Sequence, residues 1–210
     1  MDKTRILAVD CSLRMTGLAL AAEGKTVASE SQDLGRRQSA ELPLMAERLL
    51  AETGWTWDDI GLVAVTNGPG YFTGIRVGAA WASALAYGLG VPVVPVSSLE
   101  MLAYPAGGGI LSVVYAGRSA VYAASFGCDN PLEQGEYGGA DIAGWLAGHT
   151  DVTVVSDDAT RASEALGLEH PLPIREVRPD VRRLAELAWG RRGEAVSPMA
   201  LRMTYCRSPL

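Results

Sequence analysis

Two sets of residues have the types and spacing that could handle a phosphate group. Asp10 and Ser12 follow a short apolar run, so a carboxylate and a hydroxyl lie together where a predicted strand ends. Gly68, Gly70 and Thr73 lie in a glycine-rich turn between another apolar run and a predicted helix. The unpaired N–H groups at such a helix start can hold an anion. These five residues are therefore where a nucleotide loop, active or vestigial, is expected.

The same residues also have a purely structural interpretation. The Asp10 carboxylate can accept hydrogen bonds from the N–H groups of its own turn. Gly68 and Gly70 allow backbone angles that a side chain would forbid, and Thr73 is placed to cap the following helix. The turn is not a Walker loop, because no Gly-Lys-Ser/Thr follows its glycines. Both interpretations fit the sequence.

The chain has few residues that could bind a metal ion or form a disulfide. Cys11, Cys128 and Cys206 are odd in number and widely separated, so they predict neither a disulfide framework nor a Cys-x-x-Cys metal site. His149 and His170 lie in unrelated segments, and no His-Glu-x-x-His occurs. We therefore expect no metal site. The sequence also lacks the metal ligands that a metallopeptidase would need.

Size and charge narrow the function classes. The chain has 210 residues, 48% of them hydrophobic, which suits one or two compact domains with a sizeable core. Its formal net charge of −6 disfavours a large basic surface for nucleic acid. The sequence has no signal-peptide pattern and no apolar run of membrane-spanning length, so we expect a cytoplasmic protein without a membrane partner.

The first half of the chain predicts an antiparallel meander followed by strands that alternate with helices. Connections through helices imply parallel strands beside the meander. This order is typical of a ribonuclease H-like lobe, the unit of the actin-like ATPase fold. The expected elements are strands at 6–10, 17–22 and 26–28, a helix at 39–53, a strand at 62–65, a helix from the glycine turn to about 89, a strand at 93–96 and a short helix to 101.

The second half predicts a smaller, strand-rich lobe after the glycine-rich break at 104–109. Residues 127–148 are weakly patterned, with a short helix at 142–146. The other expected elements are a hairpin of strands at 110–115 and 120–126 turning at 117–119, a strand at 152–155, a helix at 159–166 and a last helix, capped by Asp180, that ends at Gly190. We therefore predict an α/β fold with lobes at 1–103 and 104–179, the second lobe reduced and the helix at 180–190 returning to the first lobe.

The helix after the glycine turn carries small residues at every fourth position. Gly74, Gly78, Ala82 and Ala86 therefore share one face, which lets another backbone approach closely. That face packs either on the chain's own sheet or on a helix from a partner. In the second case, Ala82→Leu weakens partner binding and spares the fold. The residues expected at a partner interface are these four, Trp81 and Leu85 of the same helix, and Leu42, Met45 and Leu49 of the helix before it.

Three stretches of the chain resemble one known protein family. Residues 6–12 resemble its opening strand and Asp-Thr-Ser turn. Gly68 to Arg76 is close to its Gly-Pro-Gly-Ser-Phe-Thr-Gly-Val-Arg signature, and Val91 to Leu99 resembles the segment that follows. Through these three stretches, residues 5–103 resemble the TsaB (YeaZ) family. Its members are the non-catalytic subunit of the bacterial machinery that makes threonylcarbamoyladenosine in tRNA.

The resemblance implies an actin-like fold of two lobes without catalytic residues or a cofactor of its own. Family members pair with the catalytic subunit TsaD through the first two helices, and the ATPase subunit TsaE joins that pair. Any nucleotide would then bind at the interface with partner subunits, and tRNA would be contacted only indirectly. A helix face of this kind rarely stays bare, so the isolated protein is expected to form a homodimer. The alternative is an active nucleotide-handling enzyme that uses Asp10, Ser12 and the glycine turn.

Three single positions and one three-residue turn depart from the family pattern. Cys11 replaces a threonine, Gln38 a histidine and Tyr71 a serine, while residues 115–117 replace an Asp-Ala-Arg turn. Contacts that the family makes through that last turn are therefore not transferred to this chain.

Overall fold

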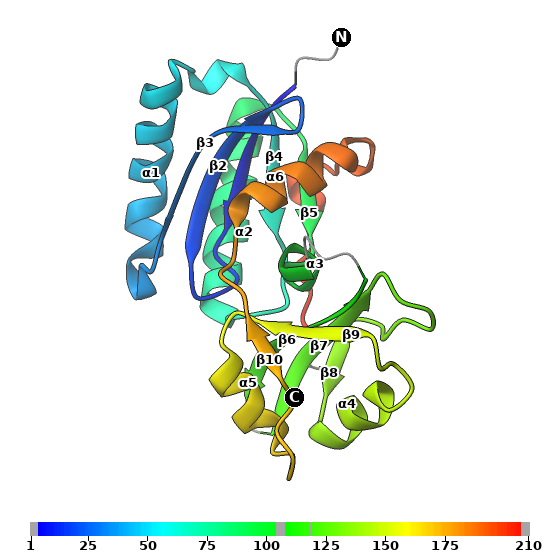
Figure 1. The fold of residues 1–210 in the computed structure, drawn as a ribbon. Helices are drawn as coiled ribbons and strands as arrows, with labels where there is room; N and C mark the ends of the chain where they lie inside the picture. The colour runs from blue at the N-terminus through cyan, green and yellow to red at the C-terminus, as the bar shows by residue number, and fades with distance from the viewer. Residues whose placement is uncertain (1–3, 104–107, 118, 207–210) are drawn as a thin grey trace. The chain divides into compact units, whose positions relative to one another are not determined.

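The structure is a computed structural model that describes residues 4–103, 108–117 and 119–206. The chain divides into two compact units, each with its own sheet (Figure 1). The first unit comprises Met1–Met101 and Asp180–Thr204, and the second Leu102–Pro179 and Tyr205–Leu210. Residues 104–107 of the predicted break and residue 118 of the predicted hairpin turn lie outside the described residues.

The first unit is built on a mixed sheet of strand order β3-β2-β1-β4-β5. β1 pairs antiparallel with β2 and parallel with β4, and β4 pairs parallel with β5. The central strands are buried on both faces because helices cover both sides of the sheet. The strands are β1 (Arg5–Asp10), β2 (Thr16–Ala22), β3 (Lys25–Gln32), β4 (Ile60–Thr66) and β5 (Val93–Val96).

Helices α1 (Gln38–Thr53) and α2 (Phe72–Leu89) pack on one face of this sheet, and α6 (Val181–Gly190) packs on the other (Figure 1). Leu18 of β2 belongs to the core cluster that includes residues of α1 and α2, whereas its neighbour Gly17 lies against Val181 of α6. Successive residues of a strand face opposite sides of the sheet, so this pair identifies the two faces. The remaining helix that begins in this unit is α3 (Ser98–Ala103).

The second unit has a mixed sheet of strand order β10-β9-β6-β7-β8. β6 pairs antiparallel with β7 and parallel with β9. Its core joins apolar residues of β6, β7 and β9 to those of two short helices. The elements are β6 (Gly109–Gly117), β7 (Ala120–Phe126), β8 (Gly135–Tyr137), α4 (Gly139–Leu146), β9 (Val152–Ser156), α5 (Ala159–Leu166) and β10 (Ile174–Glu176).

The predicted α/β fold class is confirmed, and the predicted helices and longer strands are present close to the expected bounds. Asp180 caps α6 as predicted, since its side chain accepts a hydrogen bond of 3.0 Å from the N–H of Arg182. β8 and β10 were not predicted, and β3 extends four residues beyond its predicted end at Ala28. Across the described ranges, no helix combines the length and the apolar composition needed to cross a lipid bilayer.

Candidate functional site

The Asp10 carboxylate is buried and bonded to the chain's own donors. Asp10 ends β1 and is 1% exposed. Its Oδ1 accepts hydrogen bonds from the Ser12 N–H at 3.0 Å, the Ser12 hydroxyl at 2.7 Å and the Thr66 hydroxyl at 2.6 Å. Burial raises the pKa of Asp10 above its ordinary value, although these hydrogen bonds oppose the shift. Asp10 therefore links the ends of β1 and β4.

The glycine turn packs directly against the turn that follows Asp10. A Cβ atom at Gly70 would lie 2.2 Å from the Ser12 carbonyl oxygen, and one at Gly74 would lie 1.9 Å from that of Cys11. The Tyr71 N–H donates to the same Ser12 oxygen at 2.8 Å. The structure thus brings Asp10 and Ser12 onto one turn and the glycines onto a second turn that touches it. Carbonyl oxygens therefore occupy the space in which a Cβ atom at either glycine would lie.

The prediction that Thr73 caps α2 is wrong. The helix begins at Phe72, and its N-cap is Tyr71, whose backbone is extended and whose side chain makes no capping hydrogen bond. Thr73 therefore lies in the first helical turn, and it is exposed. The N–H of Tyr71, the N-cap residue, donates instead to the carbonyl oxygen of Ser12.

The small-residue face of α2 packs within the chain itself, so its assignment to a partner interface is wrong. Gly74, Gly78, Ala82 and Ala86 are all buried. A Cβ at Gly78 would meet Cβ of Cys11 at 3.1 Å and its Sγ at 3.3 Å. Small residues at these positions let α2 approach the turn after β1 closely, which is the first of the two alternatives that the sequence left open.

The other residues assigned to a partner interface also face the core. Leu42, Met45 and Leu49 of α1 are at most 1% exposed and belong to the core cluster of the first unit. Trp81 and Leu85 of α2 are partly buried and pack against the same cluster. The chain's own core therefore covers the three α1 residues, whereas Trp81 and Leu85 keep part of their surface exposed and stay predicted interface residues.

The exposed side of α2 carries a second stripe of four-residue spacing that the sequence analysis missed. Each residue of this stripe lies two positions along the chain from a residue of the buried small-residue face. Two positions correspond to about 200° around a helix, so the stripe lies on the side opposite Gly74 and Gly78. Phe72 is 55% exposed, and the Arg76 guanidinium lies 3.8 Å from its ring centroid. Tyr87, next to the stripe, is 71% exposed. We define the outward stripe as Phe72, Arg76, Ala80, Ala84 and Gly88, all of them exposed.

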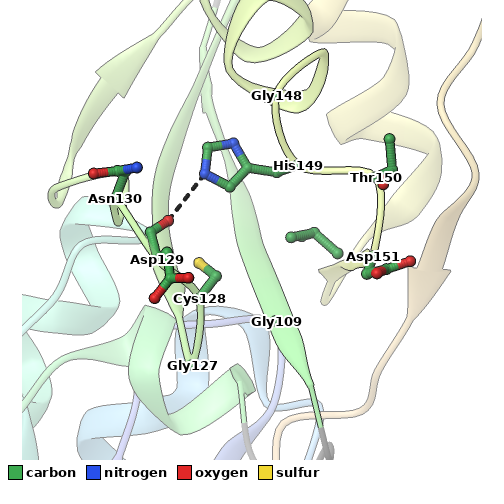
Figure 2. A pocket seen from close by; sticks show the side chains of 10 residues that line it. Gly109, Gly127, Cys128, Asp129, Asn130, Gly148, His149, Thr150 and Asp151 are labelled. Carbon is green, nitrogen blue, oxygen red and sulfur yellow. Dashed lines mark hydrogen bonds between the residues drawn. The ribbon is translucent and has the colours of Figure 1, made fainter.

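The second unit contains a polar cavity of about 580 Å³ next to His149 (Figure 2). The ring nitrogens Nδ1 and Nε2 of His149 lie 2.8 Å and 3.0 Å from the carbonyl oxygens of Trp145 and Asp129. The ring also stacks on Trp145, with 3.9 Å between centroids. Carbonyl oxygens accept only, and a neutral imidazole carries one N–H, so in that form the ring donates to one of the two carbonyl oxygens. Among the residues that the structure describes, no three His, Cys, Asp or Glu side chains gather to form a metal site.

Comparison with known sequences connects the chain with tRNA modification proteins. A family model described as TsaD, tRNA N6-adenosine threonylcarbamoyltransferase, matches residues 30–130. The chain is 35% identical over 107 residues to a tRNA threonylcarbamoyladenosine biosynthesis protein TsaB of Haemophilus influenzae, covering 50% of this chain and 44% of that protein. The corresponding Bacillus subtilis protein is 34% identical over 132 residues, which cover 60% of this chain and 57% of the relative. The aligned segments therefore span about half the length of these relatives.

Comparison with solved structures extends the similarity over nearly the whole chain. A Pseudomonas aeruginosa protein described as similar to the peptidase YEAZ has a TM-score of 0.83 and 25% identity. That alignment covers 97% of this chain and 100% of the other. YeaZ from Pseudomonas aeruginosa has a TM-score of 0.80 at 24% identity, which supports the fold.

Proposed function

The chain belongs to the TsaB (YeaZ) family, and we propose that it is a non-catalytic subunit that binds and activates the threonylcarbamoyltransferase TsaD. The product would be N6-threonylcarbamoyladenosine at position 37 of tRNA. The observation that carries this proposal is the similarity to proteins named TsaB, which combines sequence identity over half of the chain with a matching fold over nearly all of it.

The geometry around Asp10 supports a non-catalytic role. Phosphoryl transfer needs a cationic clamp, a carboxylate that binds metal and a group that positions the nucleophile. Oδ1 of Asp10 already accepts three hydrogen bonds from the chain, and carbonyl oxygens lie against Gly70 and Gly74. We therefore propose no catalytic residue and no cofactor of its own. Purified protein should hydrolyse ATP no faster than its Asp10→Ala variant.

The outward stripe of α2 is the surface that we propose for TsaD. Its small residues, Ala80, Ala84 and Gly88, would let a partner helix approach to an interaxial distance of about 8–10 Å. Exposed Phe72 and Tyr87 supply the large apolar groups that mark interaction sites. In isolation a second copy of the chain would occupy the same stripe as a homodimer. TsaE would join the TsaD complex, and tRNA would be held by the partners in the cytoplasm.

Substitution of Ala84 tests the proposed surface. Ala84→Arg places a long charged side chain in the middle of the outward stripe, and the affinity for TsaD should fall at least tenfold. Its matched control is Ala147→Arg, at an exposed position at the end of α4. Binding is measured by titration calorimetry, and tRNA modification by mass spectrometry of the nucleosides.

Ala84→Arg tests the proposed surface, and the wild-type protein tests the proposed function. If Ala84→Arg melts like wild type and still binds TsaD with full affinity, the outward stripe is not the interface. If wild-type protein neither binds TsaD nor supports formation of the modified nucleoside, the function itself is wrong.

A further inference from the structure

The end of the first unit runs along its own sheet and returns to the glycine turn. Val196 and Val93 of the edge strand β5 exchange two backbone hydrogen bonds, of 2.8 Å and 2.9 Å. Two residues later, the carbonyl oxygen of Pro198 accepts a hydrogen bond of 3.3 Å from the hydroxyl of Ser83 on α2. Leu201 then packs against the core cluster of the unit. We call residues 196–204 the C-terminal strap.

The strap ends on Asn67, the residue between β4 and the glycine turn. The carbonyl oxygen of Asn67 accepts a hydrogen bond of 2.8 Å from the N–H of Thr204. Its side-chain amide nitrogen lies 3.2 Å from the carbonyl oxygen of Arg202 and 3.2 Å from the hydroxyl oxygen of Thr204, and bonds to both. Asn67 thus binds, with both main chain and side chain, two residues that lie 135 and 137 positions away.

The neighbouring Gly68 brings the two backbones into direct contact. Its φ of +104° lies in a region that side chains rarely adopt. A Cβ atom at this position would also lie 2.7 Å from the carbonyl oxygen of Thr204, closer than real contacts allow. Glycine is therefore required at position 68 for two reasons. It adopts the backbone angle of the turn, and it leaves room for the carbonyl oxygen of Thr204.

From these contacts we infer that the C-terminal strap positions the glycine turn and the start of α2. Tyr71, the N-cap residue of α2, comes three residues after Gly68. Loops open by local unfolding, and the free energy of that opening rises with the hydrogen bonds that must break. Because the strap and the turn share three hydrogen bonds through Asn67, the two segments open together. The inference rests on this geometry and is independent of the proposed function.

Hydrogen exchange of the full-length protein tests this coupling. Asn67→Ala removes both side-chain hydrogen bonds, and amide exchange should become about tenfold faster, equivalent to about 1.4 kcal/mol, in residues 66–76 and in residues 198–204 alike. Thr204→Pro removes the N–H that donates to Asn67 and should give the same pattern from the other end. The matched control is Thr73→Ala, an exposed residue just after the turn, which should leave both segments unchanged. Peptides from β1 and β2, in the same unit, report any loss of stability of that unit as a whole.

The two segments must respond together for the inference to hold. Faster exchange in only the mutated segment would overturn it, because the strap and the turn would then open separately. Unchanged exchange in both segments for both variants would also overturn it. If Asn67→Ala does not fold, Thr204→Pro alone decides the question from the exchange of residues 66–76.

Discussion

Gly74→Ala should destabilise the protein strongly, although alanine is the better helix former. The introduced Cβ would lie 1.9 Å from the carbonyl oxygen of Cys11, whereas real Cβ atoms essentially never come closer than 3.0 Å to such an atom. The two backbones would therefore have to separate by more than 1 Å. The same substitution at Gly88, in the last turn of α2, meets nothing within 4 Å.

The magnitude follows from two opposing contributions. Replacing glycine by alanine inside a helix stabilises it by about 1 kcal/mol, and this applies at both positions. Overpacking costs about 1–3 kcal/mol and occasionally more. A clash with the main chain belongs at the upper end of that range, because no rotamer change relieves it. We expect Gly74→Ala to lose about 2 kcal/mol net and Gly88→Ala to gain about 0.5–1 kcal/mol.

Thermal and urea unfolding of the two variants measure the difference. For a chain of this size, 1 kcal/mol shifts Tm by about 2–4 °C, so Gly74→Ala should melt about 4–8 °C below wild type. Gly88→Ala should melt slightly above it. If both variants gained stability equally, α2 would not lie against the turn after β1, and the assignment of its buried face would be refuted.

Three further predictions concern the first unit. Ala82→Leu should cost about 1–3 kcal/mol in urea unfolding, because Ala82 is fully buried, whereas Ala84→Leu on the exposed side should be nearly neutral. The raised pKa of Asp10 means that the folded state binds the Asp10 proton more tightly than the unfolded state, so the free energy of unfolding should fall as pH rises above about 4. Asp10→Asn should abolish this decline. The same variant should still complement a strain that lacks TsaB. A decline that persists in Asp10→Asn would assign it to another group. Asp180→Ala should cost about 0.5–2 kcal/mol by removing the cap of α6, and Asp180→Asn should recover most of that loss in the same urea assay.

Local patterns in the sequence were enough to predict the longer elements. α5 occupies Ala159–Leu166, the range expected from its apolar spacing, and Asp180 caps α6 as its position suggested. Four strands of the first sheet, β1, β2, β4 and β5, are short apolar runs bounded by turns, which is a strong local signal. β8 and β10 have only three residues each and lack that signal. They are strands because β7 and β9 offer them a free edge, and that is a property of the folded unit.

The candidate site was predictable in its residues but not in its orientation. The sequence placed Asp10 and Ser12 on one turn and the glycines on another, and the contact between the two turns is seen only in the structure. The buried face of α2 could not be predicted, because the helix carries two stripes of four-residue spacing, both rich in small residues. Only the contact between Gly74 and the Cys11 carbonyl selects one of them. The strap likewise depends on partners 137 residues apart, which no local pattern connects.

The packing of Cys11 against Gly78 makes this thiol a natural reporter of unfolding. Cys11 is 1% exposed, and burial raises the pKa of its thiol, so a thiol reagent reaches the reactive thiolate only when the first unit opens. Cys128 and Cys206 are half-buried and belong to the second unit. Alkylation of Cys11 followed by peptide mapping would therefore time the opening of the first unit in the unmodified sequence, without an engineered probe.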